Sequence, residues 1–203
     1  MATEIPRIYL DSCVYIELFV GSPGTARFDA SAALLRSAIR GELRIVASEM
    51  VRVEVAHLGG VPSQGLRSID EAFDSPAFLW IQLDRTIARA ARAVVERGVL
   101  KPADAIHLCS AAIGKAESLC TWDSRLLSAS RDPAAEVPIY RPEDRPGQQS
   151  WTSTPRPSAG LRVSSRVSAK IHAGALNCAR VAARTVVDGS SPPIESISST
   201  PPT

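Results

Sequence analysis

The stretch IYLDSCVYIEL, residues 8–18, places a single carboxylate at the end of a short apolar run. Residues 8–10 have the composition of a buried strand, and Asp11 follows them directly. Residues 12–20 then read as a helix that Asp11 or Ser12 can cap. A carboxylate at this position is explained either by helix capping or by metal ligation, and the rest of the chain bears on that choice.

Short apolar runs alternate with helical patterns along the first 140 residues. We expect strands at 7–10, 43–48, 77–83, 117–122 and 136–140. We expect helices at 12–20, 29–42, 49–60, 63–73, 84–98, 101–115 and 124–130. This alternation predicts an α/β fold, a parallel sheet covered by helices on both faces. In such folds the ligand site lies beyond the carboxyl ends of the strands, where the strand order reverses.

The composition changes near residue 141. Residues 141–203 hold eight of the 15 prolines and eight Arg or Lys against four Asp or Glu, whereas the remainder is slightly acidic. We therefore predict a folded domain over 1–140 and a basic, Pro/Ser-rich, disordered tail over 141–203. The overall charge of +2 neither favours nor excludes a polyanionic partner.

The four cysteines form no C-x-x-C pair, which argues against structural zinc. Cys13, Cys109 and Cys120 lie in apolar contexts and read as small buried residues of a reducing compartment. Because the first residues lack an apolar signal core and no apolar run reaches membrane-spanning length, we expect a cytoplasmic protein.

Four carboxylates occupy positions that could converge. Asp11 and Asp123 follow strands, and Glu54 and Asp104 lie among apolar residues of helices. Each has an ordinary alternative as a helix cap, a partner of the helix dipole or a solvated side chain. Taken together, clustered carboxylates repel one another, and a hard divalent cation such as Mg²⁺ or Mn²⁺ relieves that repulsion.

The segments YLDSCVYIEL, SEMVRVEV, KPADAIHLCSA and CTWDSRLL resemble, in order and spacing, the four acidic motifs of the PIN domain. They are most similar to the small ribonuclease toxins of the VapC type. The resemblance covers residues 7 to about 140. It implies a three-layer α/β/α fold with about five parallel strands in the order 3-2-1-4-5.

The resemblance also implies a site and an activity. The family's acidic quartet falls on Asp11, Glu54, Asp104 and Asp123, and its supporting hydroxyls fall on Ser12 and Thr121. These residues imply Mg²⁺- or Mn²⁺-dependent endonucleolytic cleavage of RNA. The implied partners are an RNA substrate, a small antitoxin that covers the acidic cleft, and a second copy of the chain in a homodimer.

Two residues depart from the family pattern. Many members carry Asn or Ser where this chain has Cys13, and a polar residue where it has Trp122. Neither change removes a predicted ligand. The rival function is a domain of the same fold that binds RNA or protein without cleaving it, and the intact quartet argues against this alternative.

Several basic side chains accompany the acidic motifs. His57 and His107 each follow an acidic residue by three positions, a spacing also found in di-iron bundles. Because the predicted fold is not a bundle, we interpret both as histidines that pack their helices. Arg52 and Arg125 are candidates for phosphate contacts.

Overall fold

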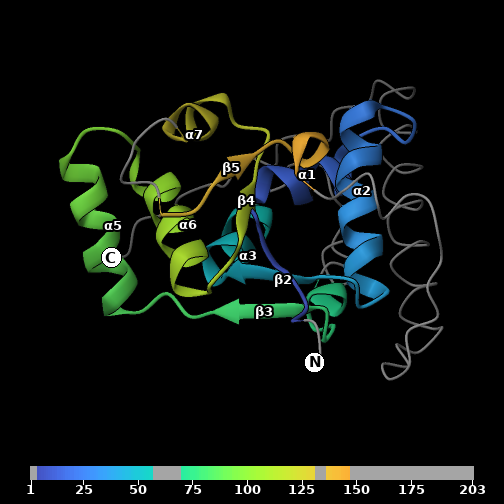
Figure 1. The fold of residues 1–203 in the computed structure, drawn as a ribbon, viewed down its shortest axis with the longest axis horizontal. Coiled ribbons are helices and arrows are strands. Elements are labelled where there is room, and N and C mark those ends of the chain that lie inside the picture. Colours follow the sequence, from blue (N-terminus) through green and yellow to red (C-terminus); the bar gives the residue numbers. More distant parts are fainter. Residues whose placement is uncertain (1–3, 57–69, 131–135, 147–203) are drawn as a thin grey trace, which may run out of the picture.

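The computed structural model describes residues 4–56, 70–130 and 136–146. Its centre is a parallel sheet in the order β3-β2-β1-β4-β5, as predicted (Figure 1). The strands are β1 (Arg7–Leu10), β2 (Arg44–Ser48), β3 (Phe78–Ile81), β4 (Ser118–Cys120) and β5 (Ile139–Tyr140). The helices are α1 (Ser12–Val20), α2 (Ala26–Ile39), α3 (Glu49–Ala56), α5 (Arg85–Glu96), α6 (Pro102–Ile113) and α7 (Ser124–Ala129), with a 3₁₀ turn η1 (Pro142–Asp144).

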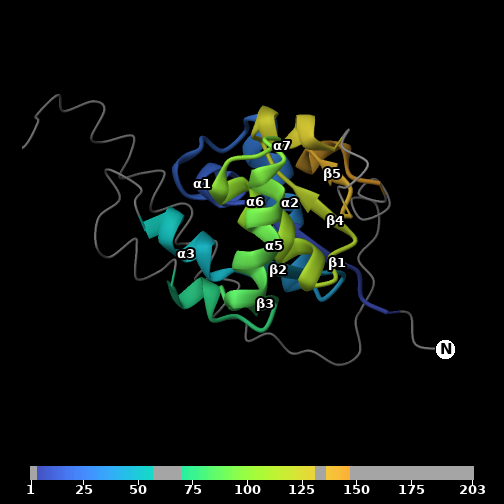
Figure 2. The same cartoon turned by 90° about the vertical axis from the view of Figure 1, so that its left-hand side faces the viewer.

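Helices cover both faces of the sheet, which gives the expected three layers. Figure 2 shows α5 and α6 in front of the strands, and α7 packs its Leu126 into the same core. Helices α1, α2 and α3 supply the opposite core together with Phe73. Because side chains alternate along a strand, Ile8 and Leu10 of β1 point into the core beside α1, α2 and α3, whereas Tyr9 points into the core beside α5 and α6.

The register between β1 and β4 brings two distant segments together. Leu10 pairs with Cys120, and the next backbone N–H, that of Asp11, donates to the Cys120 carbonyl at 3.1 Å. The strand order reverses between these two strands, because β2 and β3 lie on one side and β5 on the other. Asp11 and the residues after β4 therefore meet at the edge where a ligand site is expected.

Three of the described helices, α1, α5 and α7, begin at caps visible in the sequence. Asp84 accepts hydrogen bonds from Thr86 N and Ile87 N at the start of α5, as predicted. The predicted start of α2 at residue 29 is wrong, because the helix begins at Ala26. Thr25 Oγ1 accepts from Phe28 N there and caps a turn that the apolar spacing did not reveal.

Residues near the end of the described part of the chain pack against the sheet and its helices. Pro142 of η1 is buried, and Arg145 is also buried with its Nε 3.4 Å from Ser118 Oγ. Residues 70–73 are helical, in keeping with the end of the helix predicted over 63–73. The start of that helix, His57 and the tail from residue 147 lie outside the described residues, and the domain boundary near residue 140 stays a prediction.

Candidate metal centre

Asp11 is the fixed point of the site. It lies between β1 and α1, is 5% exposed, and caps α1 as predicted by accepting from Ser12 N at 2.7 Å through Oδ1. Its other oxygen, Oδ2, accepts a 2.7 Å hydrogen bond from Thr121 Oγ1. Both carboxylate oxygens are therefore held, and the capping role leaves the side chain at the carboxyl edge of the sheet.

Cys13 packs directly against this carboxylate. Its thiol donates to Asp11 Oδ2 at 3.0 Å, lies 3.3 Å from Thr121 Oγ1 and accepts from Trp122 N at 3.1 Å. Burial and the negative charge of Asp11 raise the pKa of the Cys13 thiol well above its usual range, so the group stays protonated. The thiol of Cys13 is a weak hydrogen-bond donor, whereas many members of the family that the sequence resembles have Asn or Ser at this position.

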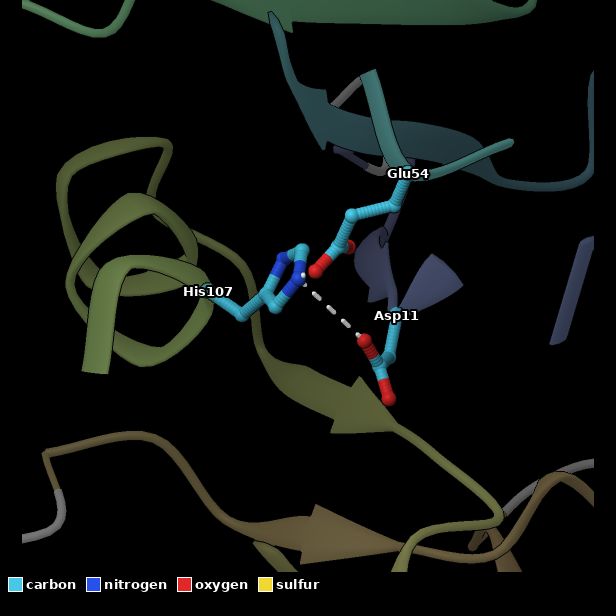
Figure 3. Close-up of side chains that lie close together, drawn as sticks. All are labelled: Asp11, Glu54 and His107. Carbon is cyan, nitrogen blue, oxygen red and sulfur yellow. Dashed lines mark hydrogen bonds and ion pairs between the residues drawn. The ribbon is translucent and has the colours of Figure 1, made fainter. Parts of the chain in front are cut away.

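Glu54 and His107 complete a compact group with Asp11. One potential ligand atom from each residue lies within 4.8 Å of the others. His107 Nε2 lies 2.8 Å from Glu54 Oε2 and 3.4 Å from Asp11 Oδ1. Figure 3 shows the three side chains pointing toward one another from α3, α6 and the end of β1.

The pKa values of this group reflect mutual stabilisation. Burial alone would raise the pKa of Glu54, but the hydrogen bond and charge of His107, with a hydrogen bond from Ser12, lower it overall. Burial alone would lower the pKa of His107, but the hydrogen bond with Glu54 and the charges of nearby carboxylates raise it. The pair therefore favours an ionised Glu54 beside a protonated His107.

Asp104 lies in the first turn of α6, outside the compact group. Its pKa is raised, first by partial burial and then by the charges of Asp123 and, more weakly, Asp11, while Arg125 opposes the shift. Asp104 thus shares the electrostatic environment of both strand-end carboxylates. Lys101 is the N-cap residue of α6, but its side chain makes no capping hydrogen bond. Pro102 is the first helical residue, where its missing backbone N–H costs no helical hydrogen bond.

Asp123 also lies outside the compact group. It caps α7 by accepting from Arg125 N at 2.7 Å, and Arg125 Nη2 lies 3.0 Å from its Oδ2. The hydrogen bonds and charge of Arg125 lower the pKa of this carboxyl. Arg125, predicted as a phosphate contact, is therefore paired with an acidic residue of the predicted quartet.

The side chains of Trp122 and Arg52 contact residues other than the four predicted ligands. Trp122 Nε1 donates to Ser31 Oγ at 3.1 Å, and the Arg27 guanidinium lies 5.3 Å from the centre of its ring. Arg52 lies over the Trp80 ring at 4.2 Å and pairs with acidic residues that include Asp74. These contacts assign Arg52 a role in stabilising the sheet edge beside β3.

The comparison with known families agrees with this geometry. The family described as the PIN domain matches residues 8–131, more than half of the chain. The chain belongs to the PIN domain family. Its members are in general metal-dependent nucleases that act on nucleic acids, which makes a divalent-metal nuclease the coarse class of this protein. No curated protein matches the chain.

The residues of this PIN domain fit a divalent cation. The edge of the sheet carries the four predicted carboxylates against one histidine and one arginine. The charges of Asp123 and Asp11 act on Asp104, and those of Asp11, Glu54 and Asp104 act on His107. Even with both bases charged, the edge keeps an excess of two negative charges. Carboxylate oxygens are the donors that hard divalent cations such as Mg²⁺ and Mn²⁺ accept. In the described part of the PIN domain, no helix has the length and apolar character to cross a membrane.

His107 is the member of the site that the sequence interpretation left out. It packs α6 against the sheet as expected, being 1% exposed, but its ring also enters the acidic group. Its position three residues after Asp104, on the same helix face, was the available signal. This spacing alone does not predict the contact with Glu54, because the contact depends on how α3 packs opposite α6.

Proposed function

We propose that this protein is a Mg²⁺- or Mn²⁺-dependent endoribonuclease and the toxin of a toxin–antitoxin pair, as the resemblance to VapC-type proteins implies. The observation that carries the proposal is the convergence of Asp11 and Glu54 at the carboxyl edge of a PIN-type sheet, with Asp104 and Asp123 acting on the same region. The RNA substrate, the antitoxin and a homodimer belong to this proposal.

Asp11, Glu54, Asp104 and Asp123 are the residues that would hold the metal. A bound divalent ion lowers the pKa of a water ligand and offsets charge on the phosphate. Asp11 is suited to a fixed position, because hydrogen bonds from Thr121 and Ser12 N leave it little freedom. Thr121 and Ser12 therefore support the site by holding the carboxylate of Asp11 in place.

Glu54 is the residue we assign to the attacking water. Its lowered pKa keeps it ionised near neutral pH, so it can orient the water by accepting a hydrogen bond or can take its proton. Its side chain is only partly exposed, at 26%, which limits competition from bulk water. Arg125 is suited to contact a substrate phosphate if it leaves Asp123.

Cleavage of RNA by the purified full chain tests the proposal. Total RNA and single-stranded DNA are incubated with the protein and Mg²⁺ or Mn²⁺, and with chelator as the control. We expect defined RNA fragments with either metal and none with chelator. Intact RNA under every condition would instead favour the non-catalytic binding module. Fragments formed equally with chelator would contradict a metal-dependent reaction.

A further inference from the structure

A buried chain of hydrogen-bonding groups leads from the core of the sheet to Glu54. Tyr9 Oη lies 2.8 Å from His107 Nδ1, and His107 Nε2 lies 2.8 Å from Glu54 Oε2. Tyr9 is fully buried and His107 is nearly so. Three separate elements, β1, α6 and α3, are connected by these two contacts.

The direction of the His107–Glu54 contact follows from the chemistry of its groups. An ionised carboxylate only accepts hydrogen bonds, so Nε2 carries a proton and donates to Glu54. The same Nε2 lies 3.4 Å from Asp11 Oδ1. His107 thus lies between two carboxylates whose negative charges would otherwise drive them apart.

Glu54 is the more exposed and less constrained of these two side chains. Asp11 is fixed at both oxygens and is 8% exposed over its side chain, whereas the Glu54 side chain is 26% exposed. Its position beside Asp11 therefore depends on donors from other elements, and of these His107 supplies a 2.8 Å hydrogen bond from α6, beside the one from Ser12.

Tyr9 in turn determines which edge of the imidazole faces the carboxylates. The two rings meet edge to face, with centroids 5.8 Å apart. A flip of the His107 ring would exchange its nitrogens for carbons and would break the contact with Tyr9 Oη together with that to Glu54. The hydroxyl of Tyr9 therefore stabilises the one ring orientation that serves Glu54.

We propose that His107 and Tyr9 are positioning residues that hold Glu54 beside Asp11. The inference rests on the proposed function, in which Glu54 acts on the attacking water or completes the metal shell. The two residues act through Glu54 and touch neither substrate nor reacting atoms. Partners of this kind change metal affinity or activity by about 10–100-fold when they are removed.

A double-mutant cycle tests whether His107 acts through Glu54. His107→Ala, Glu54→Gln and the double variant are compared with the wild-type full chain in kcat and KM for RNA, and in Mn²⁺ affinity by electron paramagnetic resonance. We expect His107→Ala to lower kcat or Mn²⁺ affinity by about 10–100-fold with RNA KM little changed. In the Glu54→Gln background the same change should have almost no further effect.

Conservative variants separate positioning from a general loss of structure. The amide of His107→Gln can still donate near the position of Nε2, so this variant should recover most of the loss. Tyr9→Phe keeps the ring and removes only the hydroxyl, and its smaller loss should also vanish in the Glu54→Gln background. Glu96→Gln, a matched carboxylate-to-amide change in the exposed pair with Arg92, should behave as wild type.

The results distinguish this inference from the proposed function. Independent, multiplying effects of His107→Ala and Glu54→Gln would overturn it, as would wild-type values in His107→Ala. If the wild type binds Mn²⁺ but cleaves no RNA, the proposed nuclease activity fails, and the affinity cycle alone supports or overturns the positioning role. A wild type that binds no Mn²⁺ would overturn both.

Discussion

Thr121 donates a 2.7 Å hydrogen bond to Asp11 across the seam between β4 and β1. The same Oγ1 accepts from the backbone N–H of Asp123 at 2.9 Å, so one hydroxyl connects two carboxylates of the predicted quartet. Thr121 is fully buried. Its hydroxyl therefore has no water to replace either partner, and the orientation of Asp11 depends on it.

Replacing Thr121 tests this connection. Thr121→Val keeps the shape of the side chain but leaves buried hydrogen-bonding groups unpaired, which should reduce stability by about 1–3 kcal/mol. We also expect at least about tenfold slower metal-dependent RNA cleavage, because Asp11 loses its strongest donor at Oδ2. Thr121→Ser retains the hydroxyl and is the matched control. Equal urea midpoints and equal rates in the two variants would argue against the connection.

The contact of Cys13 with Asp11 predicts a slowly reacting thiol. Burial and the charge of Asp11 raise the pKa of Cys13, and the thiolate is the form that is alkylated. In metal-free protein at a pH of about 8, iodoacetamide should modify Cys13 far more slowly than it does after unfolding in urea. Peptide mapping by mass spectrometry identifies the modified cysteine. Rapid modification of Cys13 in the folded chain would contradict the contact.

Arg125 and Asp123 predict competition between a protein cation and a metal. The Arg125 guanidinium is exposed and holds Asp123 through Nη2 at 3.0 Å. Arg125→Gln removes a positive charge from the acidic edge, so Mn²⁺ should bind more tightly. If the arginine also contacts a substrate phosphate, KM for RNA should rise in the same variant. Calorimetry and steady-state kinetics measure the two effects, and weaker Mn²⁺ binding would contradict the competition.

The His107–Glu54 pair predicts how stability depends on pH when metal is absent. The pKa of His107 lies above 6.5 in the folded state, because the hydrogen bond with Glu54 and the carboxylate charges outweigh burial. Its contribution to stability is therefore complete below about pH 6.5 and is lost as pH rises through the folded-state pKa. The contribution of Glu54 has the opposite sign, being lost as pH falls through its lowered pKa.

Urea unfolding in chelator between about pH 6 and pH 9 checks this sign. The free energy of unfolding should fall with rising pH in the wild type, and this part of the fall should be absent in His107→Gln. Glu96→Gln should retain the wild-type slope, since Glu96 forms an exposed pair on α5. The same slope in wild type and His107→Gln would show that His107 gains no proton affinity from the site.

The sequence alone predicts the alternation of elements and the role of Asp11 as a cap, because both depend on local patterns. The strand order needed the family resemblance, since nothing in the strands themselves specifies their neighbours. Contacts across the fold could not be predicted locally. The approach of Cys13 to Thr121 depends on the register of β1 and β4, and that of His107 to Glu54 depends on how α6 packs against α3.

Binding of Mn²⁺ to the wild-type chain and to Asp11→Asn, measured by calorimetry, tests the central claim most directly. Asn keeps the size of the side chain and one oxygen to cap α1, so the fold should persist while the charge at the centre of the site is lost. We predict saturable Mn²⁺ binding in the wild type and its loss, or weakening by at least about tenfold, in Asp11→Asn. Equal binding in both proteins, or no binding to the wild type, would contradict a metal centre built on Asp11.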